Sequence, residues 1–271
     1  MAEPKKQNYL HGAAILAAGV VIMKILGFIY KVPLGNILGD EGYTHFLVAY
    51  NIYSVFLTVA TAGLPVALSR MISEANTMNR PNQVKRIFSV AWLTFCVLGV
   101  VCTLIMFLFP TELADALNDV EASQSILALS PAVLLVCLTS AYRGYCQGHE
   151  NMKPTTVGQV LEVLVKVVIG LVLAWYLKDL GKSLPLVSAG AIFGVTAGSL
   201  AALVYMFAYK RRNYAALPGG GDEPESRGQI LSTLLKVGIP ITLGSSVLSL
   251  INLVDSGLCM GRLQDAAGFS Y

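Results

Sequence analysis

Seven long apolar stretches, separated by short polar connections, make up most of the chain. The clearest of them, residues 87–109, contains no Asp, Glu, Lys, Arg or His. A hydrocarbon layer of about 30 Å needs about twenty helical residues to cross it, and a soluble helix of that length would carry a polar face. The pattern therefore predicts an all-α, polytopic membrane helix bundle with spans at residues 10–34, 44–69, 87–109, 124–146, 156–177, 184–209 and 232–258.

Composition supports this assignment. The chain is 55% hydrophobic and 13% charged, with a mean hydropathy of +0.65, whereas soluble domains are about 25% charged. A net charge of +3 is too small to indicate a nucleic-acid partner. The first apolar stretch is too long for a cleaved signal peptide, so it is predicted to be retained as a span.

The charges of the connections alternate along the chain. Basic residues gather in the N-terminal tail and in the second, fourth and sixth connections, while the first and third carry carboxylates and no Lys or Arg. Cytoplasmic connections are enriched in Lys and Arg. We therefore expect a cell-membrane protein with its N-terminus in the cytoplasm.

The domain organisation follows from one break in this pattern. Residues 213–229 are rich in Gly, Pro and acidic side chains and are predicted to form a mobile cytoplasmic linker. It would separate a six-helix lobe, residues 1–212, from residues 230–271, which carry a seventh helix.

Pro33 is expected to end the first helix, whereas Pro65, Pro131 and Pro240 interrupt later ones. In the sixth stretch Gly190, Gly194 and Gly198 recur every fourth residue, which favours close helix packing.

The first and seventh spans are followed by similar segments. Residues 35–43 read Gly-Asn-Ile-Leu-Gly-Asp-Glu-Gly-Tyr, and residues 261–269 read Gly-Arg-Leu-Gln-Asp-Ala-Ala-Gly-Phe. Six spans separate the copies, as expected for two parallel six-helix lobes. We therefore expect a fragment that contains one lobe and the first helix of a second. The alternative is a complete seven-span, receptor-like protein.

Several charges fall at membrane depth, where they are costly and often mark a pathway. Lys24 and Lys31 lie seven residues apart on one helix face. Glu162 and Lys166 are one turn apart and could neutralise each other, while the remaining charges are Arg143 and Asp255. The cations outnumber the carboxylates, which favours a cavity for an anionic substrate such as a phosphate or pyrophosphate headgroup.

No catalytic arrangement stands out, so an enzyme is not expected. His11, His45 and His149 lie in different regions, and neither a metal site nor a cofactor is expected. The sequence has no phosphate-binding GxxxxGK[ST] loop, so transport would draw on ion or voltage gradients.

Four motifs, in order along the chain, resemble those of the polysaccharide and oligosaccharide flippases, within the multidrug/oligosaccharidyl-lipid/polysaccharide exporter superfamily. The closest group is that of the stage V sporulation protein B. The motifs are Lys24-Ile-Leu-Gly-Phe-Ile-Tyr-Lys31-Val-Pro-Leu-Gly35, Gly63-Leu-Pro-Val-Ala-Leu-Ser-Arg70-Met-Ile-Ser-Glu74, Tyr142-Arg143-Gly144-Tyr-Cys-Gln147-Gly148-His-Glu-Asn151-Met-Lys-Pro154-Thr155 and Gln159-Val-Leu-Glu162-Val-Leu-Val-Lys166.

This resemblance implies a transporter of two six-helix lobes that flips undecaprenyl pyrophosphate-linked saccharides by alternating access. By the same resemblance, Lys24, Lys31 and Arg70 match basic cavity residues of the lipid II flippase branch. Lysine stands where arginine is usual there, and lysine cannot bind a phosphate in bidentate fashion.

The expected function is therefore the flipping of an anionic lipid-linked oligosaccharide or peptidoglycan or polysaccharide precursor. The expected substrate-binding residues are Lys24, Lys31, Arg70 and Arg143, and Glu162, Lys166 and Asp255 are expected to act in gating or coupling. Two alternatives remain, namely a cation-coupled multidrug exporter and a non-transporting envelope or sporulation protein. The saccharide, the coupling ion and the oligomeric state are not determined by the sequence.

Overall fold

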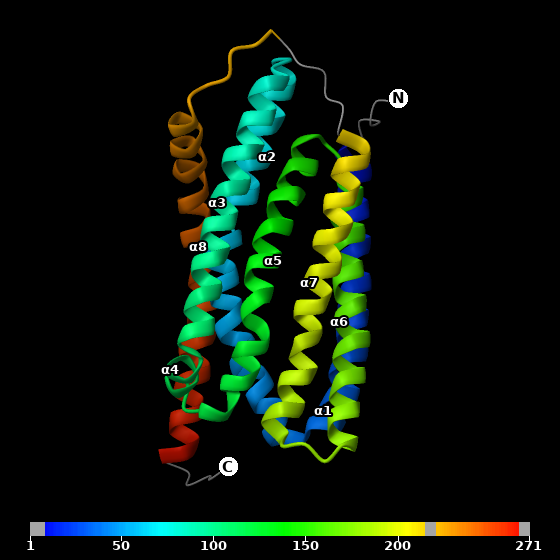
Figure 1. Ribbon diagram of the computed structural model, residues 1–271, viewed down its shortest axis with the longest axis vertical. Coiled ribbons are helices and arrows are strands. Elements are labelled where there is room, and N and C mark those ends of the chain that lie inside the picture. The colour runs from blue at the N-terminus through cyan, green and yellow to red at the C-terminus, as the bar shows by residue number, and fades with distance from the viewer. Residues whose placement is uncertain (1–8, 215–220, 266–271) are drawn as a thin grey trace.

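A computed structural model describes residues 9–214 and 221–265, and all of the regular secondary structure in these residues is helical (Figure 1). The elements, in chain order, are α1 (Tyr9–Thr61), α2 (Leu64–Thr77), α3 (Pro81–Leu108), α4 (Pro110–Asp115), the 3-10 turn η1 (Val120–Ala122), α5 (Ser123–Gly148), α6 (Lys153–Asp179), α7 (Leu184–Tyr214) and α8 (Arg227–Asp265).

The predicted all-α membrane bundle is confirmed. Six helical segments among the described residues are long and apolar enough to span a membrane, and the first, Ala14–Thr77, covers residues 14–34 of the first predicted span and all of the second. Most helices extend past the predicted spans by a few residues, because helical hydrogen bonding continues beyond the apolar stretch into polar flanking residues.

Helix α1 consists of two arms that meet at Gly39, where the chain reverses direction (Figure 1). Gly39 has φ 68° and ψ −173°, a conformation that is essentially restricted to glycine. Residues 35–43, predicted as a loop, are therefore helical apart from this one residue. The prediction that Pro33 ends the helix is also wrong. The helical turn beyond Pro33 buries Leu34 and Leu38, and this packing holds the turn in place.

The helix breaks again at Ala62 and Gly63, and α2 then begins with Pro65 in its first turn. Proline has no backbone N–H, and at the start of a helix this group would have no partner within the helix anyway. Helix α8 packs closely on this break. The Gly63 amide donates to the Thr242 hydroxyl at 3.1 Å. A Cβ atom at Gly63 would lie 2.0 Å from the Gly238 carbonyl oxygen, so no larger residue fits. Through these and further contacts, α8 lies against α1, α2 and α3.

Helices α6 and α7 approach each other along the glycine stripe of α7. A Cβ atom at Gly194 would lie 2.6 Å from the Lys166 carbonyl oxygen, and one at Gly198 would lie 2.3 Å from the Glu162 carbonyl oxygen. The predicted role of this stripe in close packing is confirmed. The stripe also fixes the distance from α7 to Glu162.

The two ends of the bundle differ in charge. The start of α1, the α2–α3 and α5–α6 junctions and the end of α7 lie at one end, which we call the N-terminal end, and the Gly39 turn, α4 and the α6–α7 turn lie at the other (Figure 1). Among the described residues, the basic connections with Arg80, Arg86 and Lys153 are at the N-terminal end, whereas the α6–α7 turn at the opposite end carries Lys178 and Lys182 beside Asp179. The acidic connections are at the opposite end. The connections at the two ends of the described bundle thus differ in charge, as the sequence predicts, apart from the α6–α7 turn.

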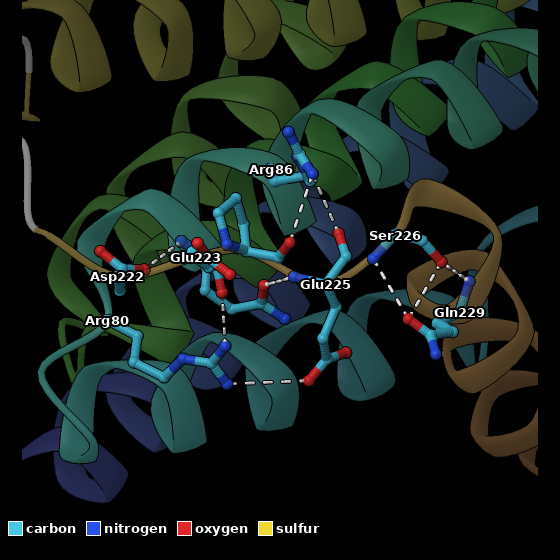
Figure 2. Close-up of polar contacts among 9 residues, drawn as sticks. Arg80, Arg86, Asp222, Glu223, Glu225, Ser226 and Gln229 are labelled. Atoms are coloured by element: carbon cyan, nitrogen blue, oxygen red, sulfur yellow. Dashed lines mark hydrogen bonds and ion pairs between the residues drawn. The ribbon is translucent and has the colours of Figure 1, made fainter.

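The linker was predicted to be mobile, but residues 221–226 are bound to the start of α3 (Figure 2). The Asp222 carboxylate accepts hydrogen bonds from the amides of Asn82 at 3.1 Å and of Gln83 at 2.9 Å. These are first-turn amides of α3, and the residue before that helix, Arg80, provides no side-chain cap. A carboxylate that lies 140 residues downstream therefore caps α3.

Further contacts complete this arrangement, which we call the linker clasp. Arg80 donates to the Glu223 carbonyl at 2.8 Å, and Arg86 donates to the carbonyls of Pro224 at 3.3 Å and Glu225 at 3.2 Å (Figure 2). The Glu225 amide donates to the Gln83 side chain at 2.8 Å. The linker is thus attached to α3 directly before α8 begins. This attachment was missed because its partners are far apart in sequence.

Candidate functional site

Lys24 and Lys31 lie on an uncovered face of the first arm of α1. Both side chains are exposed, and Phe28 between them is 70% exposed. A Cβ atom at the neighbouring Gly27 would contact nothing within 4 Å. Within the described part of the chain, neither lysine makes an ion pair or a hydrogen bond. Two ammonium groups are therefore presented at membrane depth without a compensating carboxylate.

Arg70 lies on α2 and lines a pocket of about 500 Å³ near the N-terminal end of the bundle. The pocket is rich in hydroxyl, amide and charged groups, and it is lined by Val66, Ser69, Arg70, Ser73, Glu74, Thr77 and Gln147. Most of these residues share one face of α2, and Gln147 comes from the end of α5. Hydroxyl and amide groups beside the Arg70 guanidinium and the Glu74 carboxylate form a suitable lining for a polar ligand, and Arg70 is the group in it that can bind an anion.

Arg143 and Glu162 form an ion pair inside the bundle. Arg143 Nη2 on α5 lies 2.5 Å from Glu162 Oε2 on α6, and the two side chains are only 15% and 20% exposed. The Ser199 hydroxyl on α7 donates to Glu162 Oε1 at 3.2 Å. Three helices therefore meet at one carboxylate. The sequence grouped Arg143 with the substrate-binding cations, but the structure places it in this internal cluster.

Lys166 does not take Glu162 as its ion-pair partner, although the two residues are one turn apart on α6. Its ammonium lies 5.4 Å from the ring centroid of Tyr50 and 5.6 Å from that of Tyr30, at cation–π distance. Both tyrosines belong to α1, one on each arm, so Lys166 joins α6 to both arms. The sequence predicted that Glu162 pairs with Lys166. In the structure Glu162 pairs with Arg143, and Lys166 contacts two aromatic rings instead.

Asp255 lies on α8 and its side chain is exposed. The structure thus divides the predicted site residues into three groups, namely the exposed cations Lys24, Lys31 and Arg70, the internal cluster, and Asp255. Sequence reasoning missed Ser199, Tyr30 and Tyr50. Ser199 belongs to the small-residue face of α7, which was interpreted only as packing, and the tyrosines are hard to distinguish from ordinary aromatic residues of a membrane helix.

Comparison with known proteins agrees with this architecture. The sequence pattern of the polysaccharide biosynthesis protein family matches residues 9–268. Stage V sporulation protein B of Bacillus subtilis (strain 168) is 32% identical over 203 residues, which cover 74% of this chain and 39% of that protein. The lipid II flippase MurJ of the same organism is 28% identical over 262 residues, which cover 91% of this chain and 48% of MurJ. The chain thus spans about half the length of the curated relatives it matches.

Solved structures show the same fold. A MOP superfamily transporter from Pyrococcus furiosus superposes with a TM-score of 0.72 at 16% identity, over 92% of this chain and 57% of that one. An outward-facing multidrug resistance MATE transporter of the MOP superfamily gives 0.74 at 17% identity, with the same coverage. The chain is a multi-pass membrane protein with the fold of MOP superfamily transporters, and it belongs to the polysaccharide biosynthesis protein family.

Proposed function

We propose that this chain acts in a flippase that moves an anionic lipid-linked saccharide, of the undecaprenyl pyrophosphate type, across the cell membrane by alternating access. One observation carries the proposal. Lys24, Lys31 and Arg70 have no ionic partner among the described residues, whereas the acidic residue inside the bundle, Glu162, is already paired with Arg143. With Glu74 of the Arg70 pocket counted, the net charge of these positions is still positive, which suits an anion.

The proposed roles follow from position. Lys24 and Lys31 attract the pyrophosphate as point charges, since an ammonium cannot bind a phosphate in bidentate fashion. The Arg70 guanidinium can bind a phosphate in bidentate fashion. It lies at the basic end of the bundle, among hydroxyl groups that can form hydrogen bonds with a sugar. We place the basic end in the cytoplasm, in agreement with the positive-inside rule. Arg70 then meets the headgroup at the cytoplasmic opening.

The membrane potential would drive this reaction in the outward direction. The free energy falls by about 2.3 kcal/mol per 100 mV for each negative charge that moves from the negative interior to the outside. A pyrophosphate carries more than one such charge. Continued transport also requires that the affinity for substrate differ between the two states.

The internal cluster is the proposed coupling element. Loss of the ion pair between Glu162 and Arg143 would leave that guanidinium to find another partner. Because this pair joins α5 to α6, and Lys166 joins α6 to both arms of α1, a change here would reach four membrane-spanning segments. Asp255 on α8 is a second coupling candidate.

A cation-coupled multidrug exporter is the second candidate, because one of the similar solved structures is a multidrug transporter. Such a function needs a carboxylate able to attract an organic cation. Glu162 is the predicted acidic residue within the six-helix part, and its ion pair with Arg143 makes it less available for this role.

Binding of defined lipids to the purified 271-residue chain in nanodiscs tests the proposal. Undecaprenyl pyrophosphate should bind at least tenfold more tightly than undecaprenol, which lacks the phosphates. Lys24→Gln and Lys31→Gln should each weaken binding of the pyrophosphate lipid about tenfold, or about 1.4 kcal/mol, without changing undecaprenol binding. The matched control is Lys85→Gln, which removes an exposed lysine at the start of α3.

Equal binding of the two lipids, or an equal loss in the Lys85→Gln control, would contradict the proposal. Tighter binding of an organic cation by Lys24→Glu would favour the multidrug exporter. Unchanged binding in every variant would favour a membrane protein that does not transport.

A further inference from the structure

A histidine and two glutamates come together at the end of the bundle opposite the N-terminus. Glu41 and His45 are one turn apart at the start of the second arm of α1, and Glu121 lies in η1. One ligand atom from each residue lies within 4.8 Å of the other two. Imidazole nitrogen and carboxylate oxygen are common ligands of divalent transition metals.

Asp119 orients the histidine within this group. Both oxygens of Asp119 lie 2.8 Å from His45 Nδ1, and the same carboxylate accepts a hydrogen bond from the Ala122 amide at 3.3 Å. Asp119 is 3% exposed and His45 is 2% exposed. When the imidazole is neutral, its Nδ1–H can donate to this carboxylate, and the lone pair of Nε2 is then available to a metal ion. Metal-binding histidines very often have such a partner.

The nitrogen left as a ligand is directed at Glu121. His45 Nε2 lies 3.4 Å from Glu121 Oε2, which is longer than the usual N–H···O hydrogen bond of about 2.7–3.2 Å. Two donors on a tetrahedral zinc, each at about 2.1 Å from the ion, are about 3.4 Å apart. The observed spacing therefore suits two ligands of one ion better than a direct hydrogen bond.

The charge around the group also favours a cation. Glu41, Asp119 and Glu121 surround a single imidazole. The segments that carry them provide no compensation, because residues 32–69 and 87–142 contain no Lys or Arg. The nearby Lys178 of α6 is engaged with the backbone carbonyls of Asn36 and Ile37.

We propose that Glu41, His45 and Glu121 bind a divalent first-row metal ion, best Zn²⁺, with Asp119 as a positioning residue and water completing the coordination. The ion joins the start of the second arm of α1 to the connection between α4 and α5, and so pins the two together at the acidic end. The site is independent of the proposed transport function. Sequence reasoning missed it because only the histidines were compared with one another. The visible signal was the Glu41–His45 spacing of four residues, while Glu121 is 76 residues from His45.

Calorimetric titration of Zn²⁺ into the chelator-treated, purified 271-residue chain tests the site. We expect one equivalent to bind. Glu41→Gln and Glu121→Gln, which alter exposed side chains, should each weaken binding more than tenfold. Glu112→Gln is the matched control, since it removes an exposed carboxylate from the same acidic end and should leave binding unchanged.

Asp119→Asn separates positioning from general stability. It should weaken Zn²⁺ binding ten- to a hundredfold and shift the visible spectrum of bound Co²⁺, because the imidazole is no longer held in one orientation. A purely structural role would leave the spectrum of the remaining bound Co²⁺ unchanged. Failure of the unmodified chain to bind one equivalent of Zn²⁺, or an equal loss in the Glu112→Gln control, would overturn the proposal.

Discussion

Lys24 and Lys166 are both lysines at membrane depth, yet the bundle treats them differently. Lys166 is partly buried, and its ammonium lies over Tyr30 and Tyr50. Lys24 is exposed on the uncovered face of α1, where the described residues give it no ionic partner. The same contrast separates Arg143, paired with Glu162, from Arg70, which lines a pocket. Charge at membrane depth is therefore of two kinds here, one that holds helices together and one that is available to a ligand.

The largest effect is expected from breaking the internal pair. Arg143→Ala or Glu162→Ala leaves a largely buried charge without its partner, and each should lower the free energy of unfolding by about 3 kcal/mol. The double variant should lose less than the sum of the two, because the second change removes the unpaired charge. Denaturation in mixed micelles, followed by circular dichroism, measures both. Arg70→Ala is the control, and an equal loss there would remove the distinction between the two kinds of charge.

A smaller loss is expected from widening the contact between α6 and α7. Gly198→Ala places a methyl group 2.3 Å from the Glu162 carbonyl oxygen, so the helices must separate, at a cost of about 2 kcal/mol. Gly27→Ala, on the uncovered face of α1, should leave the unfolding free energy unchanged or raise it, since alanine favours helix over glycine. Thermal unfolding of the two variants side by side gives the comparison. Equal stability would show that the stripe does not fix the position of Glu162.

The exposed lysines should contribute little to stability. Lys24→Gln and Lys31→Gln are expected to change the free energy of unfolding by less than about 0.5 kcal/mol, because neither side chain is buried or paired within the described bundle. The same denaturation assay tests this. A decrease in the free energy of unfolding as large as that of Arg143→Ala would show that these lysines hold helices together.

The linker clasp gives the most local effect. Asp222→Ala should accelerate hydrogen exchange at the amides of Asn82 and Gln83 and leave the middle of α3 unchanged. Glu223→Gln is the control, because Glu223 contributes only its backbone carbonyl to Arg80. Uniform exchange along α3 in both variants would show that Asp222 does not cap the helix.

The clasp should also persist in mild acid. Desolvation acts to raise the pKa of Asp222, but the amides of Gln83 and Asn82 outweigh it and hold the pKa below its ordinary value of 3.8. A carboxylate whose pKa is lowered by folding contributes fully above its ordinary pKa, and the contribution is lost as the pH falls through the lowered value. Protection of Asn82 and Gln83, corrected for intrinsic exchange, should therefore be the same at pH 7 and pH 5. Loss of protection between these values would contradict the assignment.

The helices could be predicted from the sequence because apolar length is a local property. Each predicted span corresponds to a helical region, and the charge pattern of the connections correctly sorted them to two ends. The turn at Gly39 was misread because Gly, Asp and Asn residues suggested a loop, whereas a single glycine reverses the chain and the helices continue on either side.

The pairing of the charges could not be predicted in the same way. Helical spacing favoured Glu162 with Lys166, but the carboxylate turns toward Arg143 and Ser199, on helices whose proximity depends on glycine contacts between α6 and α7. Neither the linker clasp nor the group around His45 has a local signature, since each joins residues more than seventy positions apart.

The single-residue reversal at Gly39 bears on how the protein is made. Because a single residue connects the two arms, the depth of one arm in the membrane determines the depth of the other. The first arm has few buried residues of its own, and Tyr30 on this arm lies 6.2 Å from Phe46 of the second arm, measured between ring centroids. We therefore expect the two arms to enter the bilayer together, as one helical hairpin, and we expect a bulkier residue at position 39 to delay membrane insertion.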